Sequence, residues 1–294
     1  MSTRRVPVSG PVSRPASVYD QVADRSAALV IESYSTSFGL ASRLLAEPVR
    51  THVRNVYALV RIADEIVDDP HCGLEVGQRD ELLTQLQEDV AQACKYGRSN
   101  NLVVHAFATT ARTVGIGAEL VDPFFASMRT DLHVTTHDAA SLERYIYGSA
   151  EVVGLMCLRA FLQDSDDGDY ERLTPGARRL GAAFQKVNFL RDLAEDHVLL
   201  GRSYFPDLDL EAFTDAQRDE LLDDIDADLA AAATVIPELP ASSRRAVLAA
   251  HALFAELAAR LRATPATTIC RQRVRVPGPV KAQVVLRALV RGTP

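Results

Sequence analysis

The sequence contains no tryptophan, and aromatic residues make up only 6% of its 294 positions. Its four cysteines show no C-x-x-C spacing, which argues against a zinc site or a disulfide framework and favours reduced, packed thiols. No apolar run approaches the roughly 18 residues that a membrane-spanning helix needs. The N-terminus carries no apolar segment of a secretory signal. These absences indicate a cytoplasmic protein.

Strand patterns and net positive charge are also scarce. The sequence has no sustained alternation of apolar and polar residues and no Asn-Gly or Asp-Gly turn, so we expect an all-α fold. The formal net charge of −7 argues against a general nucleic-acid binder. Apolar residues make up 47% of the chain, enough for a sizeable core. We expect one domain of roughly ten helices at 17–294, after a disordered tail at 1–16.

The sequence does contain a ladder of oxygen-bearing side chains in the segment 185–206, QKVNFLRDLAEDHVLLGRSYFP. Read as a helix, this segment places Asn188, Asp192 and Asp196 on one face, because residues four apart lie above one another. The intervening residues are largely apolar and would face a core. Partly buried carboxylates repel each other unless a cation lies between them. The ladder therefore suggests a hard divalent ion, with Mg²⁺ preferred.

A second ladder lies in the segment VYALVRIADEIVDD. Tyr57, Arg61, Asp64 and Asp68 are spaced four, three and four residues apart, so they share one stripe of a helix that is otherwise apolar. Two such helices facing each other would line a cavity with carboxylates. With Mg²⁺ bound, that cavity would attract a diphosphate bridged by the metal ions. Further side chains could donate to its oxygens: Arg61, Arg191, Arg202, Tyr204, Ser35 and Ser37.

Other patterns favour less specific readings. A single carboxylate ladder is often a solvated helix face, although two ladders on apolar helices make that reading less attractive. The acidic run at 223–228 is interpreted as a solvated face. His133 and His137 have a spacing that could bind zinc, but no third ligand is evident, which favours a surface or packing role. Thr174-Pro175 is expected to open the helix of the 185–196 ladder.

Five segments, taken together and in order, resemble the squalene/phytoene synthase family of trans-isoprenoid synthases. They are STSFGLASRLL, YALVRIADEIVDD, YIYGSAEVVGLMCL, QKVNFLRDLAEDHVLLGRSYFP and the basic RVRV…K segment. The resemblance covers nearly the whole chain after the tail. In detail the segments are most similar to actinobacterial phytoene synthases.

The resemblance implies an all-α isoprenoid-synthase bundle around a central cavity, with Mg²⁺ bound between the two ladders and Mn²⁺ as a possible substitute. It assigns metal binding to Asp64, Asp68, Asn188 and Asp192, with Asp196 in a second tier. The aspartates, with Arg61 and Arg191, are the expected catalytic residues. The expected substrate contacts are Tyr34, Ser35, Thr36, Ser37, Tyr57, Arg61, Tyr145, Gln185, Arg191, Arg202, Tyr204 and Arg273.

The sequence departs from the family pattern at four positions. Thr36 replaces a frequent basic residue, and Glu65 stands where aspartate is common. Glu151 stands where many members have glycine, and it would crowd or polarise a hydrocarbon tunnel unless an arginine pairs with it. Phe254 lacks the hydroxyl of a tyrosine that some members place near the diphosphate. These differences bear on the pose of the second substrate more than on the metal chemistry.

The activity implied by the resemblance is head-to-head condensation of two geranylgeranyl diphosphates to 15-cis-phytoene through prephytoene diphosphate, with no nucleotide cofactor. One alternative is a C15-using synthase that makes squalene, dehydrosqualene or presqualene diphosphate. A second alternative is a non-catalytic relative that binds prenyl diphosphates, and a third is a helical scaffold with acidic faces. The expected partners are prenyl diphosphates, without nucleic acid. Because a hydrocarbon product must leave into lipid, we also expect weak peripheral membrane contact.

Overall fold

The computed structural model describes residues 17–35, 37–69, 71–197 and 201–291, so the predicted tail at 1–16 lies outside it. These described residues form helices without any strand, and a single β-bridge joins Thr136 to Ser203, which confirms the predicted all-α fold. The helices are α1 (Val18–Tyr34), α2 (Ser37–Ser42), α3 (Val49–Asp68), α4 (Val76–Tyr96), α5 (Leu102–Val114), α6 (Ala118–His133), α7 (Ala139–Ile146), the π-helical turn η1 (Tyr147–Glu151), α8 (Val152–Phe161), α9 (Asp167–Glu195), α10 (Asp215–Val235), the 3₁₀ turn η3 (Ile236–Glu238), α11 (Ala241–Arg262), α12 (Ala266–Ile269) and α13 (Gly278–Arg291).

The ladder helix α9 begins earlier than the sequence predicts. Asp166 caps its N-terminus by accepting a hydrogen bond from the backbone nitrogen of Asp169 at 3.1 Å, and Pro175 lies inside the helix. The expected start at Thr174-Pro175 is therefore wrong. An aspartate cap, followed by acidic residues in the first turn, interacts favourably with the free N–H groups and the helix dipole. These local interactions define the start, and the proline is accommodated within the helix.

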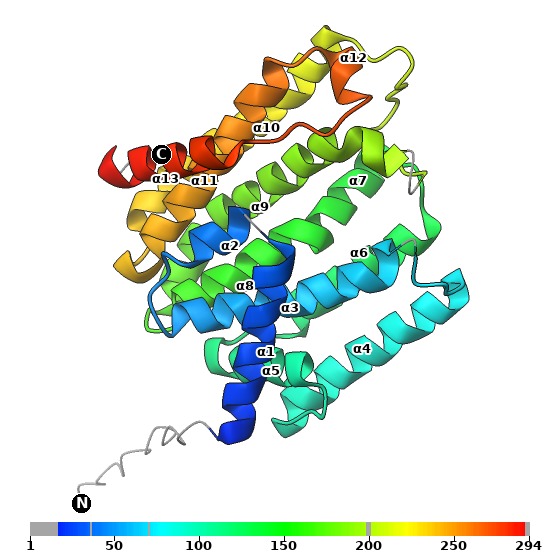
Figure 1. Cartoon of the computed structure of the whole chain (residues 1–294). Coiled ribbons are helices and arrows are strands. Elements are labelled where there is room, and N and C mark those ends of the chain that lie inside the picture. The colour runs from blue at the N-terminus through cyan, green and yellow to red at the C-terminus, as the bar shows by residue number, and fades with distance from the viewer. Residues whose placement is uncertain (1–16, 36, 70, 198–200, 292–294) are drawn as a thin grey trace, which may run out of the picture.

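The continuous helical stretch α7–η1–α8 lies at the centre of the molecule (Figure 1). It separates a core built mainly from α3–α6 and α8 from a second core built mainly from α7 and α9–α12. The backbones of α8 and α9 approach closely where glycines meet. A Cβ on Gly154 would lie 2.8 Å from the carbonyl oxygen of Ala177, and one on Gly181 would lie 2.6 Å from that of Ala150. Only glycine allows this approach.

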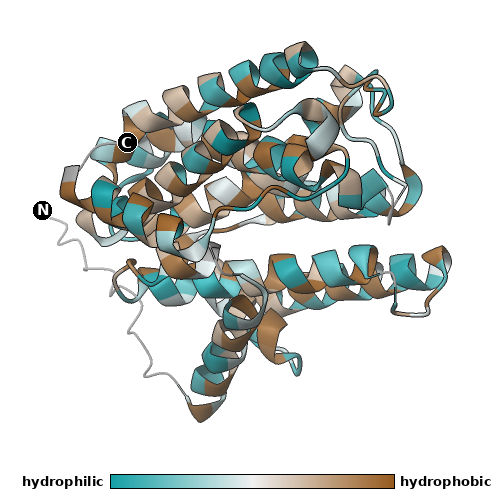
Figure 2. Cartoon of the chain, turned by 45° about the horizontal axis from the view of Figure 1, so that its top comes forward, coloured by the Kyte–Doolittle hydropathy of each residue, from teal (hydrophilic) through white to brown (hydrophobic). Residues whose placement is uncertain are grey.

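Most helices are amphipathic, and hydrophobic and hydrophilic residues give them two differently coloured sides in Figure 2. Their apolar sides supply the two cores, in which Phe107, Phe124 and Phe125 are among the largest fully buried side chains. Within the described ranges, no helix is long and apolar enough to cross a membrane.

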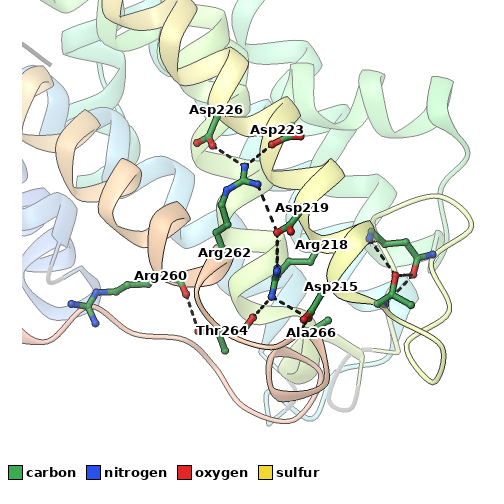
Figure 3. Close-up of polar contacts among 11 residues, drawn as sticks. Asp215, Arg218, Asp219, Asp223, Asp226, Arg260, Arg262, Thr264 and Ala266 are labelled. Carbon is green, nitrogen blue, oxygen red and sulfur yellow. Dashed lines mark hydrogen bonds and ion pairs between the residues drawn. The ribbon is translucent and has the colours of Figure 1, made fainter.

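Ion pairs join α10 to its neighbours (Figure 3). Arg262 of α11 donates to Asp223 at 2.8 Å and to Asp226 at 2.9 Å. Asp228 behaves differently from these exposed carboxylates: it is 2% exposed and pairs with Arg179 at 2.8 Å and with Lys186 at 2.7 Å. The prediction that the whole run is a solvated face is therefore wrong at this position, because α10 turns Asp228 towards α9.

Candidate active site

Helix α3 forms one wall of the candidate site. Its apolar residues are buried in the core, whereas Asp64 and Asp68 lie on the opposite, partly exposed side. Burial, followed by repulsion from Asp68, raises the pKa of Asp64 well above its usual value. This helix therefore presents two electrostatically coupled carboxylates, one of which strongly favours a proton or a nearby cation.

Helix α9 forms the other wall. Leu190 and Leu193 are buried in the core, while Asn188 and Asp192 are only partly buried and lie on another side of the helix. Asp196 follows as the C-terminal cap residue of the same helix. The side-chain oxygen Oδ1 of Asn188 is buried and accepts no hydrogen bond. Such an oxygen is costly to bury unless a ligand completes its coordination.

The two walls face each other closely enough to interact electrostatically. Burial raises the pKa of Asp196 to about 7, and repulsion from Asp192 on α9 and from Asp68 on α3 adds to the effect. The structure thus brings together the two carboxylate ladders, which are more than a hundred residues apart in the sequence. A proton or a metal cation would relieve their mutual repulsion.

Arginines neutralise these carboxylates in the described structure. Arg191 donates from Nε to Asp192 at 2.8 Å, and Nε of Arg273 lies 2.9 Å from the same carboxylate. Arg202 donates from Nη1 to Asp68 at 2.7 Å. Each arginine therefore lies beside a ladder carboxylate, at a position from which it could instead reach a phosphate oxygen.

Asp131 of α6 is a member of the site that sequence reasoning missed. Its side chain is 4% exposed, and Oδ2 accepts a hydrogen bond from the hydroxyl of Tyr145 at 2.8 Å. Arg202 donates from Nη2 to the backbone carbonyl of Asp131 at 2.9 Å. Burial raises the pKa of Asp131 to about 7, against the opposing effect of Arg202. The sequence offers no ladder here, because no second carboxylate follows one helical turn away.

An aromatic layer packs beneath this polar cluster. The Tyr204 ring stacks on Phe189 with the centroids 4.0 Å apart, and it lies 5.5 Å from the Tyr145 ring. The His137 ring is stacked with that of Tyr204, with the centroids 5.9 Å apart, and His137 shares a 2.8 Å hydrogen bond with Ser141. This position supports the predicted packing role of His137.

The site shows no preassembled metal centre: nowhere in the described ranges do three or more His, Cys, Asp or Glu side chains surround a common position. The residues nevertheless fit a hard divalent ion. Their donor atoms are all oxygens, which Mg²⁺ prefers. Oδ1 of Asn188 and Oδ1 of Asp131 are both buried without a hydrogen-bond partner. The raised pKa of Asp64 and of Asp196 also shows how strongly these groups favour added positive charge.

A basic cavity of about 360 Å³ adjoins the α9 wall. Burial, followed by repulsion from Arg191, lowers the pKa of Lys281, which lines the cavity. Phe254, which departs from the family pattern, stacks on Phe184 with the centroids 3.7 Å apart. A cavity lined by both cations and apolar side chains suits an anionic head group joined to a hydrocarbon tail. The cavity is lined by Arg191, Leu253, Phe254, Leu257, Arg273, Val274, Arg275, Val276 and Lys281.

Four further predicted substrate contacts lie close to one another: Tyr34, Ser35, Tyr57 and Arg61. The guanidinium of Arg61 lies 4.5 Å from the centre of the Tyr34 ring and also pairs with Glu65. Burial raises the pKa of Tyr57, and the positive charge of Arg61 and a hydrogen bond with Ser35 oppose this effect. The structure therefore gathers these side chains around Arg61. Two further predicted residues cannot be placed in this way: Thr36 lies outside the described residues, and the side chain of Ser37 is not described.

Gln185 of α9 and Glu151 of the π-helical turn η1 both form side-chain hydrogen bonds between these two elements. Gln185 donates from Nε2 to Oγ of Ser149 at 3.3 Å, so it faces the π-helical turn. Glu151 accepts a 2.5 Å hydrogen bond from Arg178. The carboxylate that departs from the family pattern is therefore paired with an arginine, the arrangement under which it would not polarise a tunnel.

The sequence pattern of the squalene/phytoene synthase family matches residues 31–279, which contain both ladders and most of the basic segment. The chain belongs to this family. Among curated relatives, it is 28% identical over 197 residues to 4,4'-diapophytoene synthase of Staphylococcus haemolyticus, covering 65% of each chain. It is 30% identical over 173 residues to presqualene diphosphate synthase of Rhodopseudomonas palustris, covering 58% of each. The matches thus span about three-fifths of these relatives' lengths.

Solved structures of similar fold support the all-α architecture. A dehydrosqualene synthase crystallised with a ligand matches with a TM-score of 0.77 at 20% sequence identity, over 92% of this chain and 97% of that one. The squalene synthase HpnC of Alicyclobacillus acidocaldarius matches with a TM-score of 0.72, also at 20% identity, over 87% and 97% of the two chains. The fold of this family member is therefore the helical bundle of these synthases.

Proposed function

We propose that this protein condenses two prenyl diphosphates head to head, with geranylgeranyl diphosphate as the substrate and 15-cis-phytoene as the product. The observation that carries the proposal is the meeting of two carboxylate ladders beside a cavity lined by arginines. Carboxylates that hold divalent cations, together with guanidinium donors, suit the departure of a diphosphate. Family membership supports the same class of reaction.

In this proposal the chain's own residues bind, orient and shield the substrates. Asp64, Asp68, Asn188, Asp192 and Asp196 would hold Mg²⁺, which supplies Lewis-acid stabilisation of the leaving diphosphate when bound. The arginines of the site are the phosphate-binding side chains. Breaking the bond between the allylic carbon and the diphosphate oxygen of one substrate leaves a carbocation, which the double bond of the second substrate attacks. Loss of a proton then closes the cyclopropane ring of prephytoene diphosphate. Departure of the second diphosphate, rearrangement and loss of a second proton give phytoene. The apolar interior excludes water, which would quench the cation.

The choice of C20 over C15 substrates rests on the detailed resemblance of the sequence segments to phytoene synthases. The curated relatives carry names of both kinds: a diapophytoene synthase, a presqualene diphosphate synthase and, at 28% identity, phytoene synthase 3 of Zea mays. A C15-using synthase is therefore the second candidate. We further propose that residues 17–294 form one domain of a cytoplasmic enzyme that uses no nucleotide.

The decisive experiment is incubation of the purified protein with Mg²⁺ and radiolabelled C15 or C20 diphosphate, with and without NADPH, followed by product identification. The expected result is that the C20 substrate is converted to phytoene without NADPH. A C30 product would replace the proposal with the C15-using alternative, and a protein that binds both substrates without turnover would be a non-catalytic relative.

The two-walled site is tested separately by removing one carboxylate from each wall. Asp64→Asn and Asp192→Asn keep side-chain size but remove charge, so each is expected to lower kcat by at least about 100-fold. Asp223→Asn is the matched control, because Asp223 is an exposed carboxylate on α10, away from the ladders. Its activity should equal that of the wild type. Full activity in either ladder variant would show that its wall does not bind the metal.

A further inference from the structure

The C-terminal part of the chain has a charge opposite to that of the whole protein. Residues 257–294 contain eight arginines and lysines and no aspartate or glutamate, although the protein has a formal net charge of −7. Residues 239–255 and 33–46 also lack acidic residues. Two of the neighbouring acids are paired: Glu256 with Arg260 at 2.8 Å, and Glu47 with Arg50 at 3.5 Å.

The structure assembles these acid-free segments on one side of the molecule. Helix α13 packs against α11, and so does α2, which lies on the same side in Figure 1. Leu40 of α2, Ala249 of α11 and Val285 of α13 belong to one apolar cluster. Arg245 lies one helical turn before Ala249, on the same face of α11, and is exposed. The acid-free segments of three helices thus build one surface that carries cations, and Glu256, the acid on α11, is paired with Arg260.

Helix α13 carries apolar residues on its outward side as well as on its inward side. Its inward residues Val285 and Ala288 are buried. On the opposite side, Leu286 is 63% exposed and Val290 is 78% exposed. Ala282 precedes them along the same stripe and is also exposed. The outward side thus combines this apolar stripe with the exposed polar side chains of Gln283 and Arg287. Apolar side chains exposed together beside a cation suit an apolar medium or partner whose surface is polar or anionic.

We propose that this face docks on the surface of an anionic lipid bilayer. The basic apolar face is defined by Arg43, Arg245, Leu286, Arg287 and Val290, all of which are exposed. Its apolar side chains would enter the interface, and its arginines would meet lipid phosphates. The acidic remainder of the protein would be repelled by the same lipids, so the charge distribution selects one orientation.

A second copy of the chain fits this face less well than lipid does. A two-fold interface would place the same patch of each copy against its twin. The arginines of the two copies would then face each other with no acidic residue of the patch between them. Anionic lipid head groups supply the charge that a second copy lacks.

Docking on lipid would bring the basic cavity close to the bilayer, because Lys281 of α13 lines it. This consequence rests on the proposed function: a substrate with a diphosphate head and a long hydrocarbon tail could pass between bilayer and cavity without exposing the tail to water. The docking itself is measured without substrate. Lipid binding by a protein that turns over neither substrate would therefore leave this inference standing while the proposed function fails.

The test is co-sedimentation of the full chain with vesicles of phosphatidylcholine, with and without phosphatidylglycerol. We expect binding to the anionic vesicles that weakens as salt is added. The double variant Leu286→Gln/Val290→Gln should bind at least about ten-fold more weakly. Val18→Gln/Leu29→Gln is the matched control, because these residues on α1 are 76% and 65% exposed. It should bind like the wild type.

Charge is tested in the same assay. Arg287→Gln should weaken binding to the anionic vesicles by about five-fold, the effect of one arginine near such a surface. Absence of binding to anionic vesicles, or equal losses in the α13 and α1 double variants, would overturn the proposal. A wild-type dimer that Leu286→Gln/Val290→Gln converts to monomers, with lipid binding unchanged, would assign the face to a second copy instead.

A spectroscopic measurement covers the case in which the double variant fails to fold. The chain has no tryptophan, so Leu286→Trp introduces a single indole. Its emission should shift to the blue on addition of anionic vesicles and should be quenched by brominated lipids. Leu29→Trp on α1 should respond to neither. An unchanged spectrum for the α13 tryptophan would contradict the proposal.

Discussion

Replacing Arg202 with methionine is expected to lower the free energy of unfolding of the metal-free protein by about 3–5 kcal/mol, as removal of one partner from a buried ion pair usually does. The Arg202 side chain is only 6% exposed and donates hydrogen bonds to Asp68 and to the backbone of Asp131. Methionine is long and unbranched and can occupy similar space. The loss therefore comes chiefly from the carboxylates and carbonyls left without a donor.

The two acidic partners of Arg202, Asp131 and Asp68, should differ in their coupling energy with this arginine. The Asp131 side chain is 4% exposed and that of Asp68 is 41% exposed. Solvent screens a half-exposed carboxylate, which limits its coupling to Arg202 to about 1 kcal/mol or less. The buried carboxylate should show a larger coupling, even though its Oδ1 lies 3.7 Å from Nη1 of Arg202. The burial of Asp131 should therefore affect the coupling energy more than the shorter distance between Asp68 and Arg202 does.

The measurement is urea unfolding followed by circular dichroism at about pH 8 with a chelator, where Asp131 is ionised in the wild type. Double-mutant cycles would combine Arg202→Met with Asp131→Asn and with Asp68→Asn. Arg202→Lys is the control that keeps the charge but loses the planar fork of donors. A loss below about 1 kcal/mol for Arg202→Met, or a larger coupling to Asp68 than to Asp131, would refute this reasoning.

Two further predictions concern stability. The metal-free protein should become less stable as the pH rises from about 4 to about 7, because the folded state holds protons on Asp131 and Asp196, whose pKa values are raised from 3.8 to about 7, more tightly than the unfolded chain does. Asp196→Asn should flatten this decline in urea midpoints measured against pH; an unchanged slope would contradict the assignment. Gly181→Ala should lower the free energy of unfolding by about 1–3 kcal/mol, because the new Cβ would lie 2.6 Å from the carbonyl oxygen of Ala150. Gly77→Ala, whose Cβ would meet nothing within 4 Å, should be neutral or slightly stabilising, and equal losses at both positions would exclude the steric explanation.

The helices and the two ladders could be predicted because their information is local. Spacings of three and four residues place side chains on one face of any α-helix, so Asp64 and Asp68 on α3, and Asn188 and Asp192 on α9, share their faces in the structure as expected. The start of α9 nevertheless differs from the predicted one. An aspartate cap and a proline gave competing local signals, and the cap determined where the helix begins.

The sequence by itself therefore determined the helical class, the two ladders and the basic C-terminal segment. Only the tertiary structure decided which side chains from other segments of the chain contact those ladders. Asp131 and Asp228 have no distinguishing pattern around them. Each is a buried ion-pair partner only because a distant segment brings an arginine to it: Arg202 from the segment after α9, and Arg179 from α9. The same holds for α13, whose outward apolar stripe is visible only once packing shows which side is inward. Spacing along a helix follows from its geometry, whereas contacts between helices depend on how all of them pack.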